Sequence, residues 1–191
     1  MITLIICNVQ SDFIAGTMSK KSAKNILPEI KKYIKENINN IDQIVFTIDW
    51  HPFNHCSFKK NGGLWPTHCV QYTPGACIEP KLLKYVQSLN IPYQVDALGV
   101  YEEIEEYGAF NEIESIQDAT GSRYYFDSVI EVKADTDFVV CGLTGDYSII
   151  QTLKNLKLSK IEPKLLIKGV SSMDNEEKLS KFVKEWGIEK I

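Results

Sequence analysis

Apolar positions along the chain fall into short runs that alternate with stretches of helical spacing. Residues 2–7 are nearly all apolar and rich in β-branched side chains, and residues 43–48 form a similar run that ends at Asp49. Such runs are typical of strands that are buried on both faces of a sheet. Residues 22–37 carry apolar side chains at intervals of three and four, with Pro28 near the first turn, which predicts a helix.

The rest of the chain continues this alternation. We expect further strands at 93–97, 138–141, 164–167 and around Ile188, and helices at 79–89, 123–132, 147–156 and 175–186. Residues 50–75 form a long loop without a period, and the acidic stretch 101–116 has no clear assignment. Strands that alternate with helices predict a three-layer α/β/α fold, with a mostly parallel sheet of about six strands between the helices.

Length and composition restrict the class of protein. The 191 residues suit one domain spanning 1–191, and 44% hydrophobic and 24% charged residues are ordinary for a globular chain. The net charge is -4 and the lysines are scattered, so we expect no nucleic-acid partner. The apolar run at 2–7 is too short to cross a membrane and lacks the features of a signal peptide. We therefore expect a cytoplasmic protein with no membrane partner.

Polar side chains follow three of the predicted strands. Asn8 comes after the first strand, Asp49 ends the second, and residues 142–148 follow a later one. In parallel α/β sheets, ligands bind outside the carboxyl ends of the strands. We therefore expect these three segments to meet in one crevice.

The three histidines of the chain, His51, His55 and His68, all lie in the loop at 50–75. Asp49 and His51 are two residues apart, so their side chains point to the same side of an extended segment. Either His68 or His55 would complete a set of two imidazoles and one carboxylate, and the spacing does not choose between them. Such a set predicts a metal site for zinc, with iron or manganese as alternatives. The alternative interpretation is structural: the histidines form hydrogen bonds that hold the irregular backbone of the loop in place. Trp65 is a candidate wall of a pocket beside them.

Five segments carry a family resemblance. They are residues 5–13 (IICNVQSDF), 49–58 (DWHPFNHCSF), 65–71 (WPTHCVQ) with Gly75-Ala76, 107–110 (YGAF), and 142–148 (GLTGDYS) with Gln151-Thr152. In these segments the chain resembles the nicotinamidase and isochorismatase-like hydrolase family nearly end to end. The resemblance implies the isochorismatase-like fold, which is a parallel sheet flanked by helices, and a homo-oligomer.

The resemblance also implies roles for single residues. It implies that Asp49, His51 and His68 bind the metal and that His55 lies beside them or on the substrate side. The ligand would be a small molecule such as a pyridine carboxamide. Its aromatic pocket would be lined by Phe13, Trp65 and Tyr107.

The catalytic positions of the family are altered in this chain. The family's amidases use a cysteine nucleophile, an aspartate base and a supporting lysine. The matching positions here are Ser148, Asn8 and Val100, or Leu98 if a small gap is allowed. A serine hydroxyl needs a partner base to become a nucleophile, and the Asn8 amide accepts no proton at neutral pH. The sequence therefore predicts that cysteine-type amidase chemistry is lost.

Other residues offer few replacements for the altered groups. The isochorismatase branch of the family lacks the cysteine but uses the aspartate, which Asn8 also removes. Cys7 adjoins Asn8 but points to the opposite side of its strand, and we expect Cys141 in the core. Asp12 and Asp146 either take over acid–base work or, as is usual in the family, tie loops together.

Two functions fit this pattern. The first is a metal-dependent hydrolase that cleaves C–N bonds of small amides without a cysteine, because zinc can lower the pKa of its water to about 7. The second is a pseudoenzyme that keeps the pocket and serves as a small-molecule-binding or oligomeric scaffold module.

Overall fold

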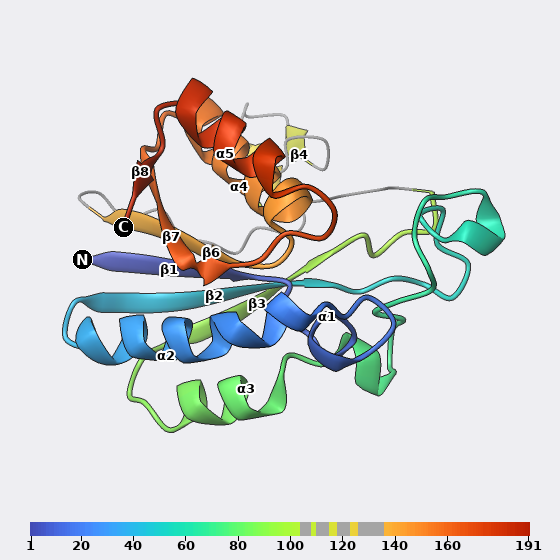
Figure 1. Cartoon of the computed structure of the whole chain (residues 1–191), viewed down its shortest axis with the longest axis horizontal. Helices are drawn as coiled ribbons and strands as arrows, with labels where there is room; N and C mark the ends of the chain where they lie inside the picture. The colour runs from blue at the N-terminus through green and yellow to red at the C-terminus, as the bar shows by residue number, and fades with distance from the viewer. Residues whose placement is uncertain (104–107, 110–114, 118–122, 126–135) are drawn as a thin grey trace.

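A parallel sheet runs through the middle of the molecule (Figure 1). The computed structural model describes residues 1–103, 108–109, 115–117, 123–125 and 136–191. The strands of this sheet are β1 (Ile2–Cys7), β2 (Ile41–Asp49), β3 (Tyr93–Leu98), β6 (Asp137–Gly142), β7 (Pro163–Val170) and β8 (Glu189–Lys190). They lie in the order β3-β2-β1-β6-β7-β8, and every neighbouring pair is parallel. The predicted parallel sheet is confirmed.

Helices cover both faces of the sheet, which confirms the three predicted layers. On one face lie α1 (Ser11–Ala15), α2 (Ile26–Glu36) and α3 (Pro80–Gln87), and on the other lie α4 (Ile150–Leu158) and α5 (Glu176–Glu185) (Figure 1). The connections contain the short helical turns η1 (Lys21–Asn25), η2 (Lys59–Asn61), η3 (Pro74–Ala76) and η5 (Gly145–Ile149).

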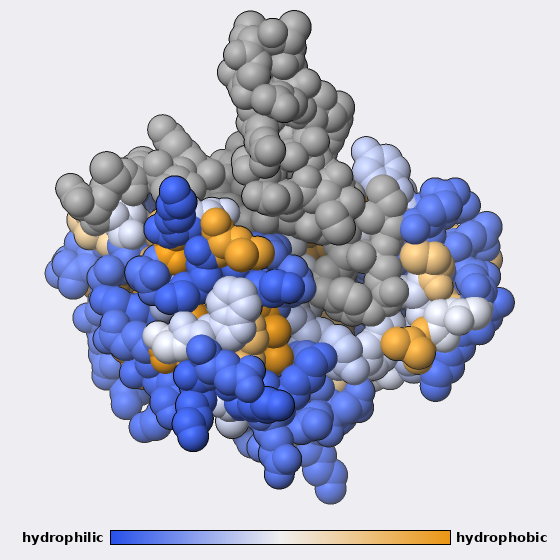
Figure 2. All heavy atoms as spheres, turned by 90° about the horizontal axis from the view of Figure 1, so that it is seen from above, coloured by the Kyte–Doolittle hydropathy of each residue, from blue (hydrophilic) through white to orange (hydrophobic). Residues whose placement is uncertain are grey.

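Local side-chain chemistry sets the starts of two helices. The Glu79 carboxylate accepts a 2.7 Å hydrogen bond from the Leu82 N–H and so caps α3. Asn175 caps α5 by accepting from two N–H groups of its first turn. α5 buries Leu179 and Val183, four residues apart, and turns its polar side outward. Figure 2 looks onto this side of the molecule, where the described surface is largely hydrophilic with small apolar areas.

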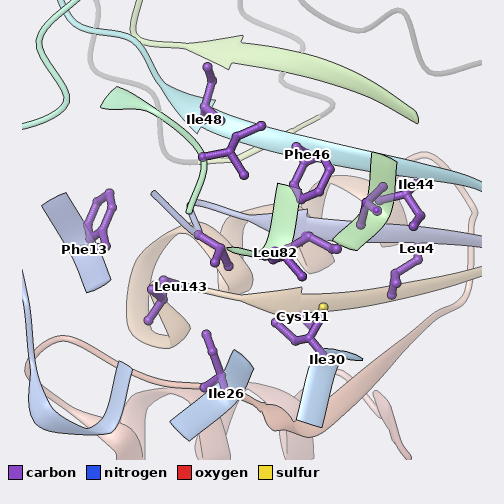
Figure 3. Packing of buried hydrophobic residues seen from close by; sticks show 14 of the residues in the cluster. Leu4, Phe13, Ile26, Ile30, Ile44, Phe46, Ile48, Leu82, Cys141 and Leu143 are labelled. Atoms are coloured by element: carbon purple, nitrogen blue, oxygen red, sulfur yellow. The ribbon is translucent and has the colours of Figure 1, made fainter. Parts of the chain in front are cut away.

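Two apolar clusters lie on the two faces of the sheet. The first joins Leu4 and Phe46 to Ile26 and Ile30 of α2 (Figure 3). The second packs the other face of the sheet against α4 and α5. Fully burying one Leu, Ile or Phe side chain stabilises the fold by about 1.5–3 kcal/mol. Cys141 lies in the first cluster, which confirms its predicted place in the core (Figure 3).

One predicted helix is wrong where the structure describes it. The spacing predicts a helix over 123–132, but β5 (Arg123–Tyr125) is a strand that pairs antiparallel with β4 (Ser115–Gln117) in a separate two-stranded sheet. The aromatic residues at 124 and 125 favour strand pairing, and this preference outweighs a weak helical period. Residues 126–132 of the predicted helix lie outside the described residues.

Two other predicted helices begin differently from the pattern. The segment at 22–37 is divided into η1 and α2, and Pro28 lies in the first turn of α2, where its missing N–H costs no hydrogen bond. The helix predicted at 147–156 corresponds to α4, which begins at Ile150. Residues 147–149 belong instead to the π-helical turn η5. In the described part of the chain, no helix has both the length and the apolar character that a bilayer crossing needs.

Candidate metal centre

The chain turns sharply into the site at Asn8, directly after β1. Asn8 has a φ of 50°, in the left-handed region that Asn tolerates better than most residues. Its N–H donates to the Thr47 carbonyl at 2.9 Å, which holds the turn against β2. The Asn8 side chain bonds Asp49 at the end of β2, and Thr144 and Ser148 of the later turn line the same cavity as Asp49. The predicted meeting of the three strand ends is confirmed.

Two loop segments bring a pair of histidines to Asp49. The His51 N–H donates to the Cys69 carbonyl at 3.0 Å, and the Gln71 N–H donates to the His51 carbonyl at 2.8 Å. This short backbone pairing sets His51 against Val70 and so brings the His68 ring to within 5.0 Å of the His51 ring, measured between centroids. Asp49 Oδ2 lies 3.7 Å from His51 Nε2 and 3.5 Å from His68 Nε2. Of the two histidines that the spacing left open as the third ligand, the structure brings His68 to the carboxylate.

Backbone carbonyls orient both imidazoles. His51 Nδ1 lies 3.0 Å from the Gly99 carbonyl oxygen, and His68 Nδ1 lies 2.8 Å from that of Pro66. A carbonyl oxygen only accepts, so each Nδ1 donates its proton to the backbone and each Nε2 is the ring nitrogen turned toward Asp49. Gly99 is required for this contact, because its φ is +60° and a Cβ there would lie 2.5 Å from His51 Cε1.

Asp49, His51 and His68 form a donor set that fits a divalent metal. Their ligand atoms all lie within 4.8 Å of one another, and all three residues are buried. Zinc–ligand distances of about 2.0–2.2 Å place the ligand atoms of one tetrahedral ion roughly 3.3–3.6 Å apart. The 3.5 Å and 3.7 Å separations from Asp49 Oδ2 are close to that spacing.

The Asp49 carboxylate stays ionised in spite of its burial. Burial by itself would raise the pKa of this carboxyl, but the neighbouring imidazoles of His51 and His68 outweigh that effect and hold the pKa well below its usual range. A carboxylate must be deprotonated to bind a metal, so this electrostatic arrangement suits a ligand.

His55 lies beside the three candidate ligands. Its ring stacks on that of His51 with the ring centroids 4.0 Å apart. The Ser57 N–H donates to His55 Nδ1 at 3.3 Å, and the Ser57 hydroxyl oxygen lies 2.7 Å from the same atom. His55 is therefore fixed in orientation and faces the cavity, as Ser57 also does.

The cavity in front of the candidate ligands is small and has aromatic walls. Its volume is about 30 Å³, whereas pockets for small molecules commonly reach about 300–1,000 Å³, so a ring-sized ligand requires the walls to move. Phe13 packs edge-on against His68, and Trp65 packs edge-on against Tyr147 with the ring centroids 5.0 Å apart. Tyr107, the third predicted wall, lies outside the described residues. The full lining comprises Phe13, Met18, Asp49, His51, His55, Ser57, Trp65, His68, Thr144, Tyr147, Ser148 and Met173.

The positions predicted to match the family's catalytic residues carry an amide at Asn8, a hydroxyl at Ser148 and an apolar side chain at Val100 or Leu98. Asn8 Nδ2 donates to Asp49 Oδ1 at 2.8 Å. Ser148 is buried and lines the cavity, and among the described residues its hydroxyl has no hydrogen-bond partner. Val100 is half-buried, and its carbonyl accepts a 3.3 Å hydrogen bond from a glutamine amide. Leu98 is buried and pairs with Asp49 across β2 and β3. Apart from the histidines, no basic residue lines the described part of the cavity.

The two acidic residues considered as replacements tie loops together. The Asp12 carboxylate accepts the Cys69 N–H at 2.8 Å. The Asp146 carboxylate accepts three backbone N–H groups of the β7–α5 connection, at 2.7, 2.7 and 3.0 Å. These hydrogen bonds hold each carboxylate between two segments of the chain that lie far apart in sequence. The contacts of Asp12 and Asp146 therefore favour the loop-tying interpretation.

Sequence reasoning missed Gln10 and Tyr147. The Gln10 side chain is buried, and its amide grips the backbone of Asp49 by donating to the carbonyl at 2.7 Å and accepting the N–H at 2.8 Å. Gln10 belongs to the first resembling segment, but nothing in its type or spacing indicates that its partner is Asp49. Tyr147 directly precedes Ser148 and lies in the irregular turn η5. The sequence pattern does not predict the direction of a side chain in such a turn.

Comparisons with known proteins agree with this fold. No protein-family model matches the chain. The nicotinamidase of Acinetobacter baylyi is 28% identical over 188 residues, which cover 90% of this chain and 81% of the relative. The crystal structure of the Pyrococcus horikoshii pyrazinamidase in complex with zinc has a TM-score of 0.74 and 26% identity, covering 99% of this chain and 97% of the other. The crystal structure of PnC1 from L. infantum in complex with nicotinate has a TM-score of 0.78 and 25% identity, covering 100% of this chain and 92% of the other.

These likenesses support the nicotinamidase/isochorismatase-like hydrolase family as the group of proteins to which this chain is similar. The Pyrococcus structure contains zinc and the L. infantum structure contains nicotinate. In this chain, Asp49, His51 and His68 form the candidate group of metal ligands.

Proposed function

We propose that this chain is a divalent-metal protein that binds a small planar ligand and lacks the cysteine-type amide hydrolysis that the family resemblance implies. The observation that carries the proposal is that one pocket combines an intact set of candidate metal ligands with altered residues at the catalytic positions. Asp49, His51 and His68 are arranged as ligands, whereas Asn8 and Ser148 stand where a base and a nucleophile would be needed.

The groups at the catalytic positions supply no acid–base chemistry. Asn8 uses its amide as a donor to Asp49, and an amide takes up no proton at neutral pH. Within the described part of the chain, nothing accepts the proton of the Ser148 hydroxyl, and a serine without such a base is a poor nucleophile. Neither Val100 nor Leu98 brings a positive charge to stabilise an anion.

The ligand class that we propose is a pyridine carboxamide or carboxylate. A bound divalent metal would supply a Lewis acid at the Asp49, His51 and His68 end of the cavity. Phe13 and Trp65 offer flat apolar walls for an aromatic ring. The nicotinate in the L. infantum neighbour supports this class. The metal that we propose is zinc, with iron or manganese as alternatives, because two imidazoles and one carboxylate suit these ions.

Metal analysis and two functional assays test the proposal. Purified protein should contain about one transition metal per chain. Nicotinate should change the fluorescence of the metal-loaded protein, and Trp65→Phe should remove that change. Incubation with nicotinamide should release no more ammonia than a protein-free blank. Ammonia release that Ser148→Ala abolishes would overturn the proposal, as would protein that takes up no metal.

A second candidate function is amide hydrolysis that depends on the metal and does not use Ser148. In the described part of the chain the candidate site offers three ligands, and catalytic zinc sites typically have three protein ligands with one position left for water or substrate. Ammonia release that a chelator abolishes and that Ser148→Ala leaves unchanged would support this candidate over the binding function.

The organisation of the whole protein also enters the proposal. By its family resemblance we propose that residues 1–191 form one isochorismatase-like domain and that the protein works as a homo-oligomer. Sedimentation analysis should give a mass that is a multiple of the 21.7 kDa chain, and a monomer at all concentrations would contradict this.

A further inference from the structure

We propose that Asn8 is a positioning residue of the metal centre, which engages one carboxylate oxygen of Asp49 and so reserves the other for the metal. At this position the family resemblance implies a catalytic base, so the proposal gives the residue a different task. It rests on the proposed function to the extent that Asp49, His51 and His68 must bind a metal.

The Asn8 amide has a partner at each end. Its Nδ2 donates to Asp49 Oδ1 at 2.8 Å, and its Oδ1 accepts from the Thr47 hydroxyl at 3.2 Å. All three side chains are buried, with exposed fractions of 1% for Asn8, 7% for Asp49 and 1% for Thr47. Turning the amide over would place its oxygen against the carboxylate, so Asp49 fixes the orientation of Asn8 and is held in return.

The two oxygens of Asp49 consequently face different partners. Oδ1 accepts from Asn8, whereas Oδ2 lies 3.7 Å from His51 Nε2 and 3.5 Å from His68 Nε2. Gln10 fixes the Asp49 backbone through the N–H and the carbonyl. With its backbone and one oxygen held, Asp49 presents Oδ2 as a one-oxygen ligand. Such hydrogen bonds to ligating carboxylates contribute strongly to metal affinity, and their loss typically costs about 10–100-fold.

The backbone at Asn8 dictates which variant tests the proposal. Its φ of 50° strains alanine but suits glycine, so Asn8→Gly removes the amide without forcing the turn to change. Thr47→Val keeps the shape of the side chain and removes the hydroxyl that braces the Asn8 amide. Ser148→Ala is the matched control, because Ser148 lines the same cavity and no side-chain bond links it to Asp49, His51 or His68 in the described structure.

The experiment is a competition for Zn²⁺ between each protein and a chromophoric chelator, together with the visible absorption spectrum of the Co²⁺-loaded protein. We expect Asn8→Gly to weaken zinc binding about 10–100-fold and to change the cobalt spectrum, because Asp49 becomes free to coordinate through both oxygens. Thr47→Val should weaken binding by a smaller factor in the same direction. The Thr47→Val change should add little in the Asn8→Gly background, since it acts through Asn8. Ser148→Ala should match the unmodified protein.

The outcomes separate this proposal from the proposed function. Unmodified protein that binds no zinc would overturn both. Zinc binding with the same affinity and the same cobalt spectrum in Asn8→Gly as in the unmodified protein would overturn the role of Asn8 alone. If Asn8→Gly does not fold, the zinc affinity of Thr47→Val tests the proposal instead. A zinc affinity of Thr47→Val equal to that of the unmodified protein would then overturn the proposal.

Discussion

Cys7 lies one residue from Asn8 but faces the opposite side of the sheet. Its thiol is fully buried in the cluster that packs under α4 and lies 3.8 Å from Thr152 Oγ1. Burial is the main cause that raises the pKa of this thiol from 9.0 to about 11. At neutral pH the thiol therefore stays protonated, and it offers no nucleophile to the cavity around Ser148.

The buried Cys7 thiol predicts a loss of stability at alkaline pH. Its pKa is higher in the folded than in the unfolded chain, so its contribution is fully present below pH 9.0 and is lost as the pH rises toward about 11. A difference of this size corresponds to about 2–3 kcal/mol of unfolding free energy. Urea unfolding at pH 7, 9 and 10.5 measures it. Cys7→Ala should be less stable at pH 7 but should lose less with rising pH, and parallel pH profiles would contradict the prediction.

Placing the family's residues at the altered catalytic positions tests whether those substitutions account for the proposed lack of amidase chemistry. Asn8→Asp, Ser148→Cys and Val100→Lys together should produce measurable ammonia release from nicotinamide, because they return a base, a thiol and a cation to one pocket. The same variant with Leu98→Lys in place of Val100→Lys tests the other alignment. Ser148→Cys alone should stay at the blank level, because the new thiol has no base beside it. Failure of both triple variants to release ammonia would contradict the prediction that these three positions determine amidase activity.

At the scale of elements, η5 and α5 are joined by one side chain. Asp146 in η5 accepts the backbone N–H groups of Met173, Asp174 and Asn175, directly before α5 begins. This connection also carries Met173 into the wall of the cavity. The position of the Tyr147–Ser148 turn relative to α5 thus depends on the Asp146 carboxylate, which does not line the cavity.

Removing the Asp146 carboxylate should destabilise the protein by about 2–4 kcal/mol, because three N–H groups in a part-buried loop lose a charge-assisted partner. Chemical unfolding of Asp146→Ala measures the loss. Asp174→Ala is the control, since Asp174 is exposed and its side chain makes an ion pair of 3.6 Å with Lys20, which contributes little. Equal stability of the two variants would show that the Asp146 bonds are dispensable.

The sequence predicts elements well where the pattern is carried by many residues. β1 and the second half of β2 are mostly apolar, and α2 buries Ile26, Ile30 and Ile34 at a spacing of four. The sequence pattern alone therefore predicts which of these residues are buried. The strand at 123–125 is too short for a period and depends on pairing with 115–117, which no local pattern encodes. Its assignment as helix is wrong for that reason.

The candidate site was predictable only in part, for a similar reason. The Asp49–His51 spacing and the ends of parallel strands pointed to one crevice. The choice between His55 and His68 depends on the backbone pairing of His51 with the segment around Cys69, which spacing does not reveal. The grip of Gln10 on the Asp49 backbone likewise arises from a bond across 39 residues of sequence.

At the scale of the whole molecule, the cavity joins the two helical layers at the carboxyl edge of the sheet. Phe13 comes from α1 on one face and Tyr147 comes from η5, which leads into α4 on the other face. The candidate metal ligands lie at the end of β2 and in the loop that follows it. A ligand or metal bound there contacts segments that the two apolar clusters hold separately. Binding should therefore stabilise the molecule as a unit.

Zinc should raise the thermal unfolding temperature of the metal-free protein. A ligand that binds only the folded state at 100 times its Kd stabilises by about 2.7 kcal/mol, which corresponds to roughly 5–10 °C for a chain of this length. Calorimetry of chelator-treated protein with and without added Zn²⁺ measures the shift. His68→Ala should lose it, because one of the three candidate ligands is gone, whereas Ser148→Ala should keep it. A metal-free protein that unfolds at the same temperature in the presence of zinc would mean that Asp49, His51 and His68 do not act together as a metal site, because a tightly bound ion cannot leave the stability of the folded state unchanged.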